Sequence, residues 1–467
     1  MDVQELLRSP EGKTVEFKRD LSSPRKIVRT AVAFANSAGG AIVIGVEDGS
    51  RTVAGVPDAL DAEERLSSIL SDSIEPRLVP EIEIVAWRNL QLLVATIYPG
   101  PSRPYRVAAE GAAGVYVRVG STNRRSDERL AAELARTTRG ESFDEQPFLE
   151  DTPDGIDLAR IARQFEEIRQ VTERDLQSLR LVVKHQGTLV PTVGGILLYG
   201  FDRDVHFPDA GFRVARFKGT DRSTILDTQD FPAASLPDQV ELVMGFVQRH
   251  IMQRLEIGTG RHEVWWEYPL VAIREAVTNA AVHADYSQLG SPLRVSVYDD
   301  RIEIENPGLL MPGLAVPDLL GGISKLRNRV IGRVFRELRL IEQWGSGVQR
   351  MVAACRDAGL ADPLLEEIGP HFRVTLYSER ASGAEQLDSV DRQLVEALRT
   401  QDGLSTKDLA ERVGRTPRAV RTRLARLVEL GIAVELGSGP TDPQRRYYAA
   451  EERGQYGRGY SSSLPLR

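Results

Sequence analysis

The feature that most constrains this chain is one stretch near its middle, residues 274–286. Its polar residues Glu275, Asn279 and His283 recur at i, i+4 and i+8, a spacing that places three side chains on one stripe of a helix. Small and apolar residues would cover the remaining faces: Ile273, Ala276, Val277, Ala280 and Val282. The pattern predicts a helix with one polar stripe inside an otherwise buried surface.

Such a stripe suits phosphate chemistry. An amide oxygen from Asn279 can hold Mg²⁺ bridging phosphates, because this hard cation prefers oxygen ligands. The carboxylate of Glu275, one turn earlier, can orient or deprotonate the water that attacks a γ-phosphate. An amphipathic helix with an ordinary wet face would show the same spacing, so both interpretations stay open.

The residues that follow predict a hairpin that ends in a polar turn. Apolar and polar residues alternate over 293–298 and 301–305, on either side of Asp299-Asp300. The second strand ends in Glu305-Asn306-Pro307-Gly308, where an acid and an amide are offered to a ligand. A Gly- and polar-rich stretch over 313–328 then has the composition of a mobile lid.

A second glycine motif, Gly345-Ser346-Gly347, precedes a predicted helix over 349–359 and a strand over 372–377. Glycines at a helix start let the backbone approach phosphates and leave free N–H groups facing them. This order of elements, over about residues 262–378, resembles the GHKL ATPase superfamily. In particular it is similar to the divergent ATP-binding domain of many bacterial transcriptional regulators.

The resemblance implies an α/β sandwich that binds ATP and Mg²⁺, with Glu275 as the catalytic base and Asn279 as the metal ligand. The nucleotide contacts that it implies are Asn279, His283, Glu305, Asn306, Gly308, Gly345, Ser346 and Gly347. The family has an adenine-binding Asp where this chain has Glu305-Asn306, which weakens the implied selectivity for adenine. A folded platform without nucleotide remains the alternative.

Residues 1–140 contain four ordered motifs: Glu16-Phe17-Lys18, Ala33–Asn36 with Gly39-Gly40, Gly45–Asp48 and Tyr116–Asn123. They accompany a predicted helix over 24–37 and strands over 41–45, 92–98 and 114–120. These motifs resemble the AlbA-like domain shared with Schlafen proteins, which implies nucleic-acid binding. The expected phosphate contacts are Lys18, Arg124 and Arg125, within a wider basic set of Arg19, Arg25, Lys26, Arg29 and Arg118. A merely solvated surface would carry the same charges.

Resemblance to RNA-cleaving Schlafens also implies a possible acidic cluster, formed by Glu11, Glu16 and Asp48. Three convergent carboxylates can hold a divalent metal for phosphodiester hydrolysis. Alternatively, Glu16 pairs with Lys18 or a backbone N–H, and Asp48 caps a turn. A metal-dependent nuclease is therefore the alternative function.

Residues 141–261 are expected to hold a linker at 144–154, two helices over 156–185, and a helix over 236–255. The stretch 193–202 echoes 39–48, with paired glycines, four apolar residues, a further glycine and an acid. This similarity predicts a strand and a second copy of the N-terminal αβ unit, or else arises by chance.

Residues 388–450 predict a winged helix-turn-helix. Ser405 to Asp408 has the form of a capping box, and Thr416-Pro417 starts the third helix. That helix would bury Val420, Leu424 and Leu427 and present its expected DNA contacts, Arg418, Arg421 and Thr422. The segment resembles the winged helices of bacterial transcription regulators, although such a domain can also bind protein.

Bulk properties limit the remaining choices. The 467 residues predict three or four domains of an α+β multidomain protein. No apolar run approaches the roughly 20 residues of a membrane span, so we expect a cytoplasmic protein without a membrane partner. A net charge of −7 means that DNA contacts must come from local basic patches. The single Cys355 excludes an internal disulfide, and 451–467 has the composition of a disordered tail.

Together these features predict a DNA-binding transcriptional regulator, expected to form a homo-oligomer, in which the nucleotide state of the GHKL-like domain modulates DNA binding. A Gly-x-x-x-x-Gly-Lys-Ser/Thr loop is absent from the sequence, which argues against P-loop helicase action.

Overall fold

The computed structural model describes residues 3–49, 51–232, 234–257, 262–341, 345–378, 389–401, 403–429, 432–437, 442 and 445–449. It forms two compact units, one of residues 1–134 with 382–467 and one of residues 135–381. The expected tail at 451–467 lies outside the described residues.

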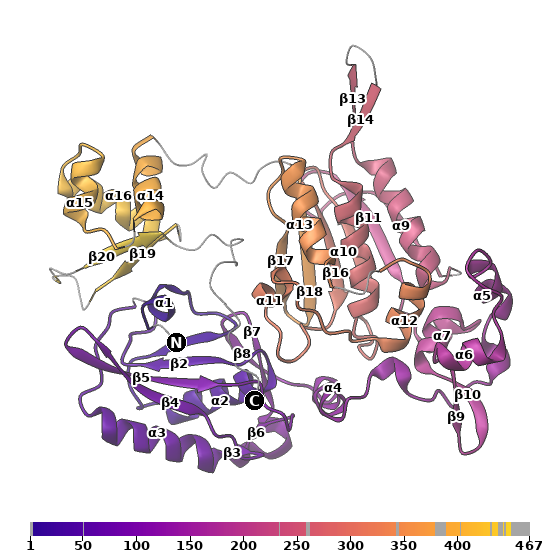
Figure 1. Cartoon of the computed structure of the whole chain (residues 1–467), viewed down its shortest axis with the longest axis horizontal. Coiled ribbons are helices and arrows are strands. Elements are labelled where there is room, and N and C mark those ends of the chain that lie inside the picture. The colour runs from indigo at the N-terminus through magenta and orange to yellow at the C-terminus, as the bar shows by residue number, and fades with distance from the viewer. Residues whose placement is uncertain are drawn as a thin grey trace. The chain divides into compact units, whose positions relative to one another are not determined.

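The N-terminal part of the first unit is a four-stranded sheet with helices α2 and α3 sharing its core (Figure 1). Its strand order is β1-β2-β5-β4, with β1 parallel to β2 and the other pairs antiparallel. Its elements are α1 (Val3–Arg8), β1 (Val15–Lys18), α2 (Pro24–Asn36), β2 (Gly40–Ile44), α3 (Ala59–Ser73), β3 (Ile74–Glu75), β4 (Glu81–Trp87), β5 (Leu90–Ile97), β6 (Arg106–Val107), η1 (Ala108–Gly114), β7 (Tyr116–Val119), β8 (Thr122–Arg125) and α4 (Glu128–Arg139). The helix and strands expected from the four motifs are confirmed.

The C-terminal part of the same unit is the expected winged helix-turn-helix. It consists of α14 (Ser389–Thr400), α15 (Thr406–Arg412), α16 (Pro417–Glu429), β19 (Ala433–Leu436) and β20 (Arg446–Ala449). Ser405 and Asp408 form the predicted capping box, and the Thr416 hydroxyl accepts from the Ala419 N–H at 3.3 Å. Val420, Leu424 and Leu427 are fully buried, as their helical spacing predicts.

Within this unit the wing strands contact the N-terminal sheet domain. Val434 and Leu436 of β19 join an apolar cluster that contains Leu6 of α1. Arg88 pairs with Asp442 at 2.6 Å, and the guanidinium of Arg8 lies 4.2 Å from the ring centre of Tyr448.

The second unit contains a six-stranded sheet of order β12-β11-β15-β16-β18-β17, in which β11 and β15 are parallel and the other pairs antiparallel. Its strands are β11 (Phe212–Phe217), β12 (Ile225–Asp230), β15 (Leu293–Val297), β16 (Arg301–Pro307), β17 (Leu364–Ile368) and β18 (His371–Tyr377). The helices packed with it in one core are α7 (Val193–Tyr199), α9 (Leu236–His250), α10 (Leu270–His283), α12 (Arg329–Glu337) and α13 (Gly347–Asp357). This arrangement is the expected α/β sandwich (Figure 1).

Shorter elements complete the second unit. They are η2 (Phe143–Glu145), η3 (Pro153–Gly155), α5 (Leu158–Gln164), α6 (Glu173–Ser178), β9 (Val182–His185), β10 (Thr188–Pro191), α8 (Arg203–His206), β13 (Gln253–Ile257), β14 (His262–Trp266) and α11 (Val316–Leu320). Strands β11 and β12 extend the sheet into residues before 262, where the sequence placed the start of the ATPase-like domain.

The strand predicted at 193–202 is wrong, because Val193–Tyr199 forms helix α7. Thr192 caps this helix by accepting from the Gly195 N–H at 2.9 Å. The paired glycines allow close packing instead of a turn: a Cβ on Gly194 would lie 2.6 Å from Val330, and one on Gly195 would lie 2.2 Å from the Leu181 carbonyl. The similarity to 39–48 is therefore not a structural repeat.

A buried carboxylate fixes the start of α12. Asp144 accepts hydrogen bonds from the backbone N–H groups of Arg329, Val330 and Ile331 at 3.0, 2.7 and 3.0 Å, and from the Ser142 hydroxyl at 2.6 Å. Burial nevertheless raises the pKa of Asp144 from 3.8 to about 6, because desolvation outweighs these bonds.

This raised pKa predicts a pH-dependent stability. Between about pH 4 and 6 the folded protein holds a proton that the unfolded chain releases, so the contribution of Asp144 falls as pH rises through that window. Asp144→Asn should remove the fall, by at most about 3 kcal/mol. Urea unfolding of both proteins from pH 3.5 to 7.5 measures this; a stability difference that stays constant would contradict it.

Candidate functional site

A cavity of about 330 Å³ lies in the second unit beside the polar stripe of α10. The predicted residues that line it are Glu275, Asn279, His283, Asn306, Gly308, Gly345, Ser346 and Gly347. They come from α10, the end of β16 and the start of α13, which are separated by up to about seventy residues in the sequence. The structure thus brings together every residue that the sequence assigned to this site except Glu305.

The stripe of α10 faces the cavity because the rest of the helix is needed for the core. Ala276, Val277, Ala280 and Ala281 are at most 3% exposed, whereas Glu275, Asn279 and His283 are only partly buried. Packing therefore fixes the rotation of the helix, and the rotation fixes where the polar side chains lie.

Close approach at Gly347 joins α13 to this stripe. A Cβ there would lie 2.4 Å from Glu275 Oε2 and 3.5 Å from Asn279 Nδ2. Glycine therefore lets the start of α13 approach the carboxylate and the amide together. Glu275 is also paired with Arg350, in the first turn of α13, and Arg350 lines the cavity too.

His283 is neutral in this setting. Desolvation, together with the nearby positive charge of Arg327, lowers the pKa of His283 to about 4. Arg327 itself donates to the carbonyls of His283 and Leu309, at 2.6 and 2.5 Å, and so ties the end of α10 to the residues after β16. A neutral imidazole in the cavity wall can accept or donate a hydrogen bond without bringing charge.

Glu305 is a correction to the sequence analysis. Side chains alternate along β16, so Ile304 and Asn306 line the cavity while Glu303 and Glu305 face the opposite side of the sheet. There Glu305 pairs with Arg222 at 2.9 Å and with Arg373 at 2.5 Å. Burial alone would raise the pKa of Glu305, but Arg373 and Arg222 outweigh burial and hold it below its usual value.

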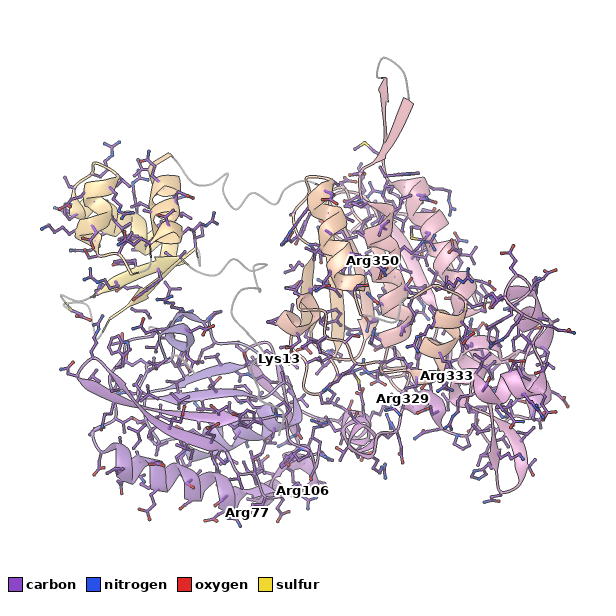
Figure 2. All side chains as sticks on the ribbon, viewed as in Figure 1. Lys13, Arg77, Arg106, Arg329, Arg333 and Arg350 are labelled. Atoms are coloured by element: carbon purple, nitrogen blue, oxygen red, sulfur yellow. The ribbon has the colours of Figure 1, made fainter. Side chains whose placement is uncertain are left out.

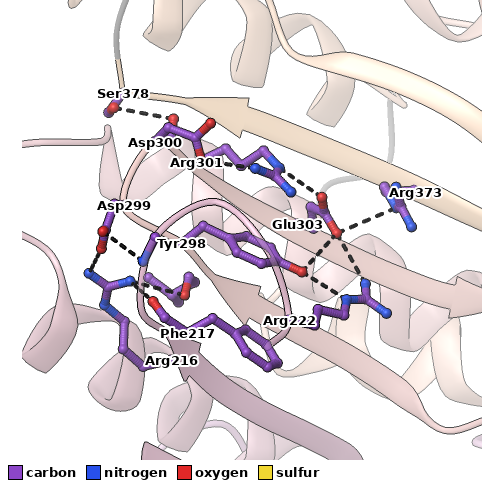
Figure 3. A network of polar contacts seen from close by, with 12 residues as sticks. Arg216, Phe217, Arg222, Tyr298, Asp299, Asp300, Arg301, Glu303, Arg373 and Ser378 are labelled. Atoms are coloured by element: carbon purple, nitrogen blue, oxygen red, sulfur yellow. Dashed lines mark hydrogen bonds and ion pairs between the residues drawn. The ribbon is translucent and has the colours of Figure 1, made fainter. Parts of the chain in front are cut away.

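Figure 3 shows this opposite face around Glu303, which contacts Arg222, Arg301 and Arg373. Figure 3 also shows Asp299, in the turn between β15 and β16, paired with Arg216. The ion pairs of Glu303 and Glu305 join β16, β18 and the loop after β11 on the side away from the cavity. Asn306, not Glu305, is therefore the polar side chain that β16 offers to a ligand.

The cavity also contains cations that were not predicted from the sequence. Lys325, Arg327, Arg336 and Arg350 all line it. Arg350 follows Gly347 by three residues and therefore lies in the first turn of the helix that begins at this glycine. That position in the sequence could have indicated that Arg350 lines the cavity. The expected lid region contributes much of the apolar lining, through residues such as Leu314, Leu319 and Ile323.

Oxygen donors suited to Mg²⁺ are present in the wall, in the Asn279 amide and the Glu275 carboxylate. Mg²⁺ needs only one or two protein oxygens when phosphates and waters supply the others. Among the residues that the structure describes, no group of three or more His, Cys, Asp and Glu side chains is placed to hold a metal by itself. The donor set therefore fits a cation brought in with a phosphate ligand.

The acidic cluster of the N-terminal domain is arranged differently. Both oxygens of Glu16 are occupied, one by Lys18 at 2.5 Å and the other by the buried guanidinium of Arg118 at 2.5 Å. Glu11 accepts from the Phe17 N–H at 2.8 Å, and burial raises its pKa, as do the neighbouring Glu16 and Asp48. The three carboxylates are neighbours, but two cations already neutralise Glu16.

The same contacts correct part of the expected basic face. The Lys18 ammonium is held by Glu16 and by the Phe17 carbonyl at 2.8 Å, and Arg118 is 1% exposed. Arg124 and Arg125 of β8 are exposed, and Arg125 contacts Glu110 at 3.5 Å. Of the three expected phosphate contacts in this domain, two are therefore accessible and Lys18 is internal.

On α16 the expected DNA contacts are all exposed: Arg418, Arg421 and Thr422. Other arginines of the helix are used within the domain, since Arg423 pairs with the buried Asp391 at 2.7 Å. The helix thus separates arginines that hold the fold from arginines that face solvent.

Three family models match the chain in sequence order. Residues 11–127 match "Schlafen, AlbA_2", residues 290–376 match "Putative ATP-dependent DNA helicase recG C-terminal", and residues 387–433 match "Winged helix-turn-helix DNA-binding". The chain therefore has the three-domain architecture indicated by its motifs: a Schlafen/AlbA-type domain, an ATPase-type domain and a winged helix.

Two solved structures are similar to parts or most of the chain. The DIP2311 protein from Corynebacterium diphtheriae shares 19% identity over 91% of each chain, with a TM-score of 0.44. The N-terminal domain of a "Putative ATP-dependent DNA Helicase RecG-related Protein" from Nitrosomonas europaea shares 25% identity over 27% of this chain and 90% of that chain, with a TM-score of 0.22. No curated protein matches the sequence. In the part of the chain that the structure describes, no helix is long and apolar enough to cross a membrane.

Gly308 provides a test of the cavity's geometry. Its φ of +102° is strained for other residues, and a Cβ there would lie 2.4 Å from Arg327 Nη1. Gly308→Ala should lower the free energy of unfolding by about 1–3 kcal/mol. The control is Gly290→Ala, where φ is +77° but nothing lies within 4 Å, and about 1 kcal/mol is expected. Equal losses in urea unfolding would show that close packing against Arg327 does not matter.

Proposed function

We propose that this chain is an ATP-binding, DNA-binding transcriptional regulator in which the nucleotide state of residues 262–380 modulates DNA binding. The observation that carries the proposal is the 330 Å³ cavity, which gathers three separate polar motifs predicted from the sequence to contact nucleotide. Its volume falls within the roughly 300–1,000 Å³ of small-molecule sites.

The two ends of the cavity suit the two ends of a nucleotide. Asn306 and apolar residues such as Leu310 and Phe372 offer a base an amide and an apolar surface. At the other end, the N–H groups at Gly345–Gly347 and the positive end of the α13 dipole favour phosphates. Asn279 would hold Mg²⁺, which neutralises phosphate charge when bound. Glu275 would orient the attacking water and accept its proton.

DNA binding is assigned to α16 of the winged helix and to the exposed arginines of β8. Exposed Arg418, Arg421 and Thr422 occupy the first turns of α16, where a recognition helix meets base edges. Helicase action through a P-loop is not part of the proposal. Gly12-Lys13-Thr14 matches the end of the P-loop motif, but Leu7 stands where the motif requires its first glycine. Nuclease chemistry is not part of it either, because Arg118 and Lys18 neutralise Glu16.

The nucleotide site is tested by separating binding from hydrolysis. Asn279→Ala should abolish Mg·ATP binding, because the only amide ligand on the stripe is lost. Glu275→Ala should keep binding and lose hydrolysis by about 10²–10⁴-fold, the usual contribution of a general base. Calorimetry and phosphate release measure the two effects. If the wild-type protein does not bind ATP or ADP at millimolar concentration, the proposed nucleotide site is wrong and the domain is a folded platform without nucleotide.

The DNA surface is tested by changing exposed charges. Arg418→Ala and Arg421→Ala should each weaken DNA binding, and an arginine that reads a base should lose about 1–3 kcal/mol of sequence discrimination. Arg65→Ala on α3, a different helix, makes the same change in net charge at an exposed site and should have little effect. Fluorescence anisotropy of the full chain at two salt concentrations measures this. If all three variants bind alike, α16 does not contact DNA.

A further inference from the structure

The ion pair between Arg350 and Glu275 is the contact from which a further role follows. Arg350 lies in the first turn of α13 (Figure 2). Its partner Glu275 lies on the polar stripe of α10. Both line the cavity, and their side chains are 32% and 17% exposed. The pair therefore stands in the wall of the site, at the end where Gly347 brings α13 against α10.

A bound phosphate would compete with Glu275 for the positive charge of Arg350. Two like charges a few ångströms apart repel each other, and water screens this repulsion less at a partly buried site than in bulk solvent. A terminal phosphate at the start of α13 would therefore be repelled by Glu275 unless a cation stood between them. Arg350 is the cation already bound to that carboxylate.

The other cationic side chains of the cavity have different contacts. Arg327 donates to two backbone carbonyls, and Lys325 donates to the Pro312 carbonyl at 2.9 Å. Arg336 lies on α12 and is exposed. Arg350 forms an ion pair with Glu275, the predicted catalytic carboxylate. A guanidinium can donate to a carboxylate and a phosphate at once through its forked N–H groups.

We propose that Arg350 reads the terminal phosphate of the bound nucleotide and, by turning from Glu275 toward that phosphate, releases the carboxylate to the attacking water. Arg350 is then the residue that distinguishes a nucleoside triphosphate from a diphosphate, and Glu275 is restrained while the site is empty. This inference rests on the proposed nucleotide site and adds to it a selectivity and an order of events.

A double-mutant cycle tests the competition. Arg350→Ala should weaken ATP binding by about tenfold or more while changing ADP binding by less than about threefold, because only ATP supplies the phosphate that Arg350 contacts. Arg350→Lys should restore part of the ATP affinity, since it keeps the charge and loses the fork. Glu275→Gln as a single substitution should strengthen ATP binding, because it removes the carboxylate that competes for Arg350. The same substitution made in the Arg350→Ala variant should not strengthen ATP binding.

The control is Arg356→Ala on the same helix, where the arginine pairs with Asp362 outside the cavity. Calorimetry with ATP and ADP on the full chain gives every affinity, and circular dichroism checks the fold. Equal losses for ATP and ADP in Arg350→Ala, or an effect of Glu275→Gln that does not depend on Arg350, would overturn the inference while leaving nucleotide binding intact. A wild type that binds neither nucleotide would overturn the proposed function and the inference together.

Discussion

The rotation of α10 determines most of what the second unit can do. Its small and apolar residues are buried against the sheet, α9 and α13, so the polar side chains that the helix presents to the cavity are Glu275, Asn279 and His283. Small side chains at 276 and 280 also keep α10 close to its neighbours. The absence of a side chain at Gly347 then brings α13 within reach of the carboxylate. The position of the polar stripe is thus a consequence of core packing.

A continuous set of contacts leads from this stripe to the segment that follows α4. Asn328 donates to the carbonyls of Val282 and Ala284, at the C-terminal end of α10, at 2.9 and 2.7 Å. The next residue begins α12, whose first N–H groups are bound by Asp144. Arg329 also donates to the Gly140 carbonyl at 2.6 Å. The end of α10 is therefore linked by hydrogen bonds to residues 140–145.

The sequence predicted those parts of the structure that depend on local pattern. Helical spacing identified α10 and the stripe of α16, alternation identified the β15–β16 hairpin, and capping residues located the start of α15. The errors arose where tertiary packing decides. Val193–Tyr199 is as apolar as a buried strand, and it forms a helix that is capped by Thr192 and packed closely against Val330 and Leu181. The sheet's extension by β11 and β12 likewise depends on pairing with β15, a partner about eighty residues away.

The candidate site shows the same division between pattern and packing. Motif spacing identified the residues on α10 and the two glycine turns, but it could not decide which of two adjacent residues on β16 faces the cavity. Strand register decides it: Asn306 faces α10, and Glu305 faces Arg222 and Arg373. Charges were harder to assign, because an arginine in sequence carries no sign of its partner. Arg118 and Arg124 belong to the same stretch of basic residues, yet one is buried against Glu16 and the other faces solvent. The chain has a net charge of −7, so nucleic acid can bind only where basic residues face solvent. Arginines that are paired with internal carboxylates are not available for this contact.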